Sequence, residues 1–298
     1  MHPFLASLLG VHDLQGVGAL GSLRHRFSDC TGVASLLSPA AVLSWLPEFT
    51  TAQWLLIALA AVGIGISKSG LPGISLLHVL IFAHLFPGIA STGVVLPMLI
   101  VGDIGAVILF RRHALWSYVT KTLPPAVVGV IMGWGILHYL PNTRFQLLIG
   151  VVILMLAVIQ LTRSWKPGLF TQLPHTQTFA WTMGFIAGVT TMVANAAGPV
   201  MGVYLLAVDL PKAEFVGTSA WFFLLINLIK IPFSLQLGLI HGKTLLFNAI
   251  LIPFIVSGLF LGRYIVSRIS QRWFDTLILG FALIVAAKLL VSGIAAAH

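Results

Sequence analysis

Apolar residues gather in ten segments along the chain, separated by short polar breaks. The segments form two sets of five, at 52–67, 73–86, 88–110, 122–140 and 145–162, and then at 179–194, 199–210, 215–240, 244–267 and 273–291. Crossing the hydrocarbon core of a membrane takes about 20 apolar residues in a helix. The longer segments approach or exceed this length, so the pattern predicts a protein of membrane-spanning helices.

The second set of segments repeats the first. Adding 127 to the position of Lys68 gives Asn195, and in later segments an offset of 129 carries Gly129 onto Gly258. Further aligned pairs are Pro72 with Pro199, Pro124 with Pro253, Gly133 with Gly262, and Phe145 with Phe274. The predicted organisation is an N-terminal extension that includes a candidate interfacial segment (1–50), a first membrane repeat (51–163), a linker (164–177) and a second membrane repeat (178–292).

The first two segments of each repeat are too short to cross a membrane separately. Each pair therefore forms either a re-entrant hairpin or two tilted, broken spans. In both cases a repeat changes sides of the membrane, so two repeats in tandem have inverted topologies. The sequence thus predicts an all-α polytopic membrane protein of two inverted repeats, each with a broken or re-entrant hairpin plus three transmembrane helices. Such interrupted segments in both halves are typical of secondary transporters.

Basic residues between the segments predict the orientation in the membrane. One side has Arg111, Arg112, Lys121, Arg163, Lys166, Lys212, Arg268 and Arg272, and the other has Arg144 and Lys243. Because positive charge concentrates in cytoplasmic loops, the first group marks the cytoplasm. We therefore predict a multi-pass protein of the cytoplasmic (inner) membrane with both termini outside the cytoplasm.

Composition supports this class and excludes others. Apolar residues make up 58% of the chain and charged residues 8%, against roughly a quarter charged in soluble domains. The net charge of +9 comes from residues at segment ends, which indicates lipid headgroups rather than nucleic acid as partners. A single cysteine, Cys30, allows no internal disulfide or CxxC pair. With no clustered metal ligands, phosphate-binding loop or nucleophile–base set, the sequence predicts no enzyme, metal or cofactor.

The break in the first repeat carries the principal candidate binding residues. Lys68 lies inside an apolar stretch, where an ammonium group costs at least about 2.5–3.5 kcal/mol. Ser67, Ser69 and Gly70 surround it, and Pro72 suits the first turn of a new helix. The lysine together with the positive end of that helix favours an anion. The alternative is that Lys68 extends to the membrane interface, as lysines near helix ends commonly do.

The second repeat offers an uncharged counterpart of this break. Asn195 occupies the position of Lys68 and is followed by Gly198 at another expected helix start. If the two breaks meet at the membrane midplane, Lys68 and Asn195 face one pocket; otherwise Asn195 caps a helix or bonds a neighbouring one. Four hydroxyl residues at repeat-equivalent positions are further candidates for the pocket or for bonds to their own helices: Ser91, Thr92, Thr218 and Ser219.

Opposite charges occupy a second pair of equivalent positions. Adding 127 to Asp103 gives Lys230, and Asn227 lies one turn before Lys230. These residues are candidates for an ion pair or gate, with Asp103 as a carrier of a coupling proton, unless they mark helix ends at the interface. His78 and His84 are candidates for a proton relay, although a lone histidine near a helix end is more often a structural hydrogen-bonding residue.

Several of these motifs resemble one family. The glycine-rich segment that ends in Ser67-Lys68-Ser69-Gly70, and its echo Gly184-Phe185-Ile186-Ala187-Gly188 before Asn195-Ala196-Ala197-Gly198-Pro199, are similar to signatures of the TauE/SafE sulfite exporter family. Also similar are Val101-Gly102-Asp103 before Arg111-Arg112, and Leu123-Pro124-Pro125 with Gly129 and Gly133. The resemblance covers about 52–291. The chain departs from it where the family has more glycines, at Ser69, Leu71, Ala196 and Ala197.

The resemblance implies export of sulfite or a small organosulfonate and suggests ion-coupled or passive anion movement. Together with the inverted repeats, it leads to the main hypothesis of a secondary transporter that works by alternating access. A passive anion channel and an importer of a related small anion are the alternatives. The expected partners are a small anionic substrate and membrane lipids, with a proton or sodium ion as candidate coupling ion. The sequence assigns no oligomeric state.

Overall fold

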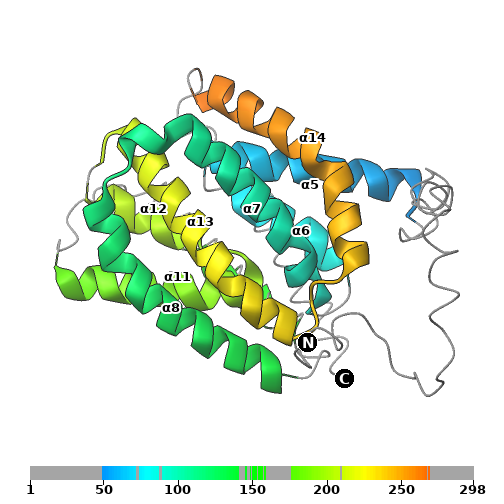
Figure 1. Ribbon diagram of the computed structural model, residues 1–298, viewed down its shortest axis with the longest axis horizontal. Coiled ribbons are helices and arrows are strands. Elements are labelled where there is room, and N and C mark those ends of the chain that lie inside the picture. Colours follow the sequence, from blue (N-terminus) through cyan, green and yellow to red (C-terminus); the bar gives the residue numbers. More distant parts are fainter. Residues whose placement is uncertain are drawn as a thin grey trace, which may run out of the picture. The chain divides into compact units, whose positions relative to one another are not determined.

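Helices make up almost all of the part of the chain that the structure describes. This computed structural model describes residues 49–71, 74–86, 89–140, 176–208 and 210–266, together with Arg268 and nine positions between 145 and 158. The helices are α5 (Thr51–Lys68), α6 (Ser75–Leu85), α7 (Ala90–Phe110), α8 (Trp116–Tyr139), α11 (Gln177–Ala194), α12 (Gly198–Ala207), α13 (Lys212–Gln236) and α14 (Gly242–Val266), with a 3-10 turn, η2 (Arg111–His113), after α7 (Figure 1).

These helices agree closely with the predicted segments. An all-α architecture is confirmed over the described residues, and the described positions of segment 145–162 are helical. One helix, α8, begins six residues before its predicted segment, because Trp116–Lys121 forms a polar first turn and a half that an apolar pattern does not reveal. The last predicted segment (273–291), most of the linker and nearly all of the N-terminal extension lie outside the described residues.

The described residues include both long helices and short ones. Five stretches are long and apolar enough to cross a membrane, namely Thr51–Lys68, Ala90–His113, Trp116–Tyr139, Ala213–Gln236 and Thr244–Ile265. In contrast, α6 has 11 residues and α12 has 10, each shorter than the roughly 20 residues that a span requires. Each short helix follows directly after a polar break. The chain is therefore a multi-pass membrane protein whose short helices stand beside full-length ones.

The two repeats exchange helices with one another. Helix α5 of the first repeat packs along α14 of the second, and α11 of the second packs along α8 of the first (Figure 1). Between these two pairs, α7 packs against α13. The exchange places the end of α5 and the end of α11 on either side of the α7–α13 pair, and so positions both breaks near the centre of the bundle.

Glycines allow the exchanged helices to approach closely. A Cβ atom at Gly65 would overlap the carbonyl oxygen of Ile255 on α14, and one at Gly188 would overlap the carbonyl oxygen of Ala126 on α8. Small residues serve this purpose in membranes because association there depends on backbone proximity and van der Waals packing. The repeat-equivalent residues Gly129 and Gly258 both lie at these crossings, so the 129 offset relates two similar contacts.

Large apolar side chains cover the outside of the described helices. Leu55, Ile108, Val128 and Phe260 are each more than half exposed. Many large apolar side chains exposed on helices of this length are expected where a helix faces lipid. Several polar and charged side chains are instead buried inside the bundle, among them Asp103, Asn195 and Lys230.

Candidate functional site

Both breaks have a backbone conformation that ends a helix. Helix α5 ends at Lys68, and Gly70 follows with φ of 111°, a value that side chains strongly disfavour. Helix α11 ends at Ala194, and Asn195 caps it in the left-handed conformation with φ of 53°. Asparagine tolerates this region better than most residues. The chain therefore turns sharply at each break and presents Lys68 and Asn195 at the ends of their helices.

Lys68 forms a buried ion pair with the carboxylate of Asp103 on α7. Its Nζ lies 2.6 Å from Oδ1 of Asp103, whose side chain is fully buried. The second carboxylate oxygen accepts a hydrogen bond of 2.7 Å from Nδ2 of Asn227 on α13. The ammonium also lies 4.5 Å from the ring centroid of Phe223. Both oxygens of Asp103 are thus engaged, and Lys68 faces a charge and an aromatic surface rather than the membrane interface.

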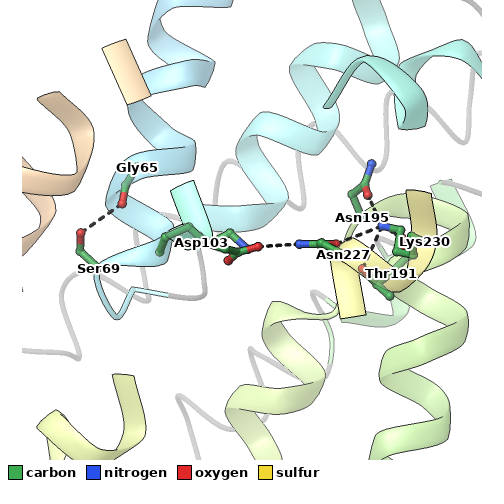
Figure 2. Close-up of polar contacts among 8 residues, drawn as sticks. Gly65, Ser69, Asp103, Thr191, Asn195, Asn227 and Lys230 are labelled. Carbon is green, nitrogen blue, oxygen red and sulfur yellow. Dashed lines mark hydrogen bonds and ion pairs between the residues drawn. The ribbon is translucent and has the colours of Figure 1, made fainter. Parts of the chain in front are cut away.

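Lys230 forms the corresponding contact in the second half. Its Nζ donates to Oδ1 of Asn195 (2.6 Å) and to the carbonyl oxygen of Thr191 (2.7 Å), with the Thr191 hydroxyl at 3.2 Å and Oδ1 of Asn227 at 3.4 Å. The Asn195 amide in turn donates to the carbonyl oxygen of Thr92 on α7 (2.9 Å). All acceptors of Lys230 are neutral oxygens (Figure 2).

These contacts form one continuous polar network through the bundle. Asn227 joins its two halves, because its amide donates to Asp103 and its carbonyl oxygen accepts from Lys230 (Figure 2). The sequence led us to consider a direct Asp103–Lys230 pair. The ion-pair partner of Asp103 in the described residues is instead Lys68, because Asn227 lies between Asp103 and Lys230 and bonds to both.

The network relates to the repeat in a regular way. Lys68 pairs with Asp103, and adding 127 to both numbers gives Asn195 and Lys230, which also pair. Each break residue thus bonds to the central helix of its own half. The formal charges of the two lysines and the aspartate sum to one positive charge. Buried ionisable residues in membrane proteins are expensive and are generally functional.

A cavity lies beside this network and draws on both breaks. Seven of the predicted site residues line it: Ser67, Lys68, Gly70, Asn195, Gly198, Ser219 and Asn227. Because Gly198 begins α12, the N-terminal end of that helix borders the cavity and adds a partial positive charge. The structure therefore brings Lys68 and Asn195 to one cavity, as the shared-pocket interpretation requires.

Other predicted residues lie elsewhere. The hydroxyl of Ser69 donates to the carbonyl oxygen of Leu259 on α14 (2.8 Å), and the hydroxyl of Thr218 accepts from the amide of Leu115 (3.0 Å). Neither residue is among those that line the cavity. Both hydroxyls join a helix to a neighbouring segment, which is a structural role.

The remaining hydroxyl residues divide between two cavities. Ser91 and Thr92 line a smaller cavity that also contacts Asn195, and the Thr92 hydroxyl donates to the carbonyl oxygen of Ile89 (2.8 Å). Ser219 lines the main cavity, although its hydroxyl donates to the carbonyl oxygen of Phe215 in its own helix (2.7 Å). These helix-internal bonds are the alternative that the sequence left open.

Sequence reasoning did not assign three polar cavity residues to the binding site: Ser75, His78 and Thr191. His78 is 1% exposed, and neither of its ring nitrogens has a hydrogen-bond partner among the residues that the structure describes. The expected structural hydrogen bond of this histidine is therefore absent. A signal was available in the spacing, because Ser75 and His78 lie three residues apart, on one face of the short helix after the break.

Metal ligands do not cluster in the described part of the chain, where no group of three or more histidine, cysteine, aspartate or glutamate residues is placed to hold an ion. The site consists of ammonium, carboxylate, amide, hydroxyl and imidazole groups. This set binds ions and polar molecules by hydrogen bonds and charge.

A helical membrane protein with a positively charged polar network beside an internal cavity has the architecture of a membrane transporter. The family model for Sulfite exporter TauE/SafE matches residues 55–289. The chain belongs to this family of membrane transporters. No curated protein matches the chain, and no solved structure matches it.

Proposed function

We propose that the protein exports sulfite or a small organosulfonate across the cytoplasmic membrane as a secondary transporter. The observation that carries this proposal is the buried network of Lys68, Asp103 and Lys230 beside the cavity. Its single excess positive charge suits a small monoanion, and the interior position suits a site reached from one side at a time. The family supports a sulfur-containing anion as substrate.

Alternating access between two inverted repeats is the proposed mechanism. The reciprocal exchange of α5 onto α14 and α11 onto α8 supports a pseudo-two-fold relation between the halves. In such a protein, one pair of helices rocks against the other around a fixed central site. Two inverted repeats would place both termini on the same side of the membrane, and the distribution of basic residues favours the side outside the cytoplasm. Reporter fusions at the two ends test this orientation directly.

Lys68 is the proposed contact for the anion. It lines the cavity with its side chain 9% exposed, while its ammonium group contacts Asp103 and Phe223. An arriving anion adds a second negative partner to Lys68. The arrangement gives Asp103 a second role, because a carboxylate that balances Lys68 in the empty site limits the cost of burying the lysine.

Counterflow in proteoliposomes tests the transport mechanism. Vesicles loaded with excess unlabelled sulfite are expected to accumulate labelled sulfite transiently, since a carrier exchanges one substrate for another. A passive channel gives no such accumulation, and that result would reject alternating access. Absence of movement or binding of both sulfite and methanesulfonate would reject the substrate class. An importer would be identified by uptake in cells that lose the activity together with the gene.

Two lysine variants test the site. Lys68→Gln is expected to weaken sulfite binding by about tenfold or more, because a charge-assisted contact contributes about 1.5–3 kcal/mol. Lys121→Gln is the matched control, because Lys121 is exposed on α8 and does not line the cavity. Equal affinity in purified, folded Lys68→Gln and wild-type protein would remove Lys68 from the binding site.

A further inference from the structure

The cavity contains one buried titratable side chain that the proposed function leaves unused. His78 projects from α6, is 1% exposed and lines the cavity together with Lys68 and Asn227. Neither Nδ1 nor Nε2 has a hydrogen-bond partner within the described protein. Burying a polar group without a partner destabilises a protein. A group of this kind at a cavity wall indicates that a ligand or water satisfies it.

The repeat shows that the scaffold does not require a histidine here. Adding 127 to His78 gives Leu205, which is fully buried in α12. The same offset carries Ser75 to Gly202, so both polar residues of α6 in the cavity have apolar counterparts. Packing in the second repeat is thus achieved with leucine, and the imidazole is a feature of the first repeat alone.

The chemistry of the ring restricts what it binds. A neutral imidazole offers one N–H donor and one nitrogen acceptor. An oxyanion oxygen accepts from the N–H, but only a ligand or water with its own proton donates to the other nitrogen. Hydrogen sulfite in its O-protonated form supplies both an acceptor oxygen and an O–H donor. Sulfate and simple sulfonates supply acceptors only.

The charges of the residues around the cavity favour the same ligand, hydrogen sulfite. The buried charged groups beside the cavity, among the described residues, are Lys68 on α5, Asp103 on α7 and Lys230 on α13, with one excess formal positive charge between them. Helix α13 also carries Lys212 and Glu214 in its first turn, and their formal charges cancel. Hydrogen sulfite carries one negative charge and balances that excess. Sulfite and sulfate carry two and leave one negative charge buried in the bundle, which is costly.

We propose that His78 is a substrate-binding residue that selects hydrogen sulfite, the protonated monoanion, over oxyanions that have no hydroxyl group. The proposal rests on the proposed function and specifies its substrate. An anion oxygen lies at Lys68, and one ring nitrogen of His78 accepts from the hydroxyl group of the anion. The other ring nitrogen reaches an anion oxygen only through a water, because the two nitrogens point in nearly opposite directions. No covalent bond forms or breaks, and the proton crosses the membrane with its anion.

Binding measurements on purified protein test the proposal with three probes: sulfite, methanesulfonate and sulfate. Each is titrated one unit below and one unit above the pKa of hydrogen sulfite. Wild-type protein is expected to bind the sulfite probe several-fold more tightly at the lower pH and methanesulfonate equally at both. If sulfite and methanesulfonate show the same pH dependence, the protein titrates rather than the ligand, and the selection of hydrogen sulfite is overturned.

Variants separate His78 from the rest of the site. His78→Leu, which introduces the residue of the second repeat, is expected to weaken sulfite binding roughly tenfold and to remove its pH preference. Methanesulfonate binding should change less than twofold. His78→Gln retains a donor and an acceptor and is expected to recover most of the affinity. His84→Leu is the control, because His84 is exposed on the same helix.

The outcomes distinguish this inference from the proposed function. Unchanged sulfite binding in His78→Leu overturns the role of His78 while the exporter proposal stands. Equal losses for sulfite and methanesulfonate indicate a structural role and also overturn it. If wild-type protein binds neither sulfite nor methanesulfonate, the proposed function fails, and this inference, which rests on it, fails as well. If His78→Leu does not fold, the wild-type pH comparison and His78→Gln still decide.

Discussion

The two breaks carry different charges at repeat-equivalent positions, a lysine at 68 and a neutral asparagine at 195. In the first half, the Lys68 ammonium pairs with a carboxylate, so the contact is neutral overall. In the second half, Lys230 contacts an amide oxygen, a hydroxyl and a carbonyl oxygen, and no carboxylate bonds to it directly in the described part of the chain. The excess positive charge of the network therefore originates in the second half. The polar contact thus forms at equivalent positions in both halves, but the charges of the residues that form it differ.

This difference divides two roles between the halves. Lys68 lines the cavity, but its charge is already balanced by Asp103. Lys230 does not line the cavity, but its positive charge contributes to the electrostatic field there. Asn227 connects them, because its amide and carbonyl groups bond to opposite halves. An anion in the cavity is thus expected to respond to changes at Lys230 even without touching it.

Removal of the Asp103 carboxylate should have the largest effect on the difference between the two halves. Asp103→Asn leaves two buried ammonium groups with no anionic partner, and breaking a buried pair in this way costs about 3–5 kcal/mol. We expect a large fall in the melting temperature in detergent and loss of transport. Adding sulfite should partly restore the melting temperature, because the anion replaces the missing charge. A variant as stable as wild-type protein would show that Lys68 is not balanced by Asp103.

The two helix crossings should respond alike. Gly65→Ala and Gly188→Ala each place a methyl group against the backbone of the partner helix, which we expect to cost about 1–3 kcal/mol. Thermal unfolding measures both effects. Gly135→Ala is the control, because no atom lies within 4 Å of its added Cβ atom, and a small gain in stability is expected there. Markedly unequal effects at the two crossings would argue against equivalent packing in the two halves.

Giving the second half a carboxylate should abolish the difference between the breaks. Asn195→Asp supplies Lys230 with an anionic partner and reduces the formal charge of the network from one to zero. We expect sulfite binding about tenfold weaker, because one buried charge acts at short range in a low dielectric. Gln177→Glu changes the total charge equally at an exposed helix start and serves as control. Undiminished sulfite affinity in Asn195→Asp would show that the excess positive charge does not contribute to binding.

The smallest expected effect separates packing from binding at the first break. Ser69→Ala removes the hydrogen bond to Leu259 and should lower the free energy of unfolding by about 1 kcal/mol, with sulfite affinity unchanged. Ser257→Ala removes a hydroxyl that bonds only within its own helix, so a smaller change is expected. A loss of affinity in Ser69→Ala with stability intact would return Ser69 to the binding site.

Much of the site was accessible from the repeat pattern. The 127 offset identified Lys68, Asn195, Asp103 and Lys230, and these four residues form the core of the network. Position alone did not give their partners. The Asn227–Asp103 bond joins residues 124 apart in the chain, and the Asn195–Thr92 bond joins residues 103 apart. Such bonds depend on how distant helices cross.

Side-chain direction was the second limit. Ser67, Lys68 and Ser69 are consecutive, yet Ser67 and Lys68 line the cavity while Ser69 bonds to α14. Successive residues on a helix point about 100° apart, so only one face of the break reaches the cavity. Which face does so is set by the contact between Gly65 and α14, and the sequence does not contain that rotation explicitly.

The sequence by itself determined the helical class, the family and the residues at the two breaks, and it predicted the duplication. Those properties follow from hydrophobicity and spacing, which are local along the chain. Tertiary structure decided that Lys68 rather than Lys230 pairs with Asp103, that Ser69 and Thr218 bond to neighbouring segments, and that the imidazole of His78 lies unpaired at the cavity. These properties depend on the crossing and rotation of helices, which packing between distant segments fixes.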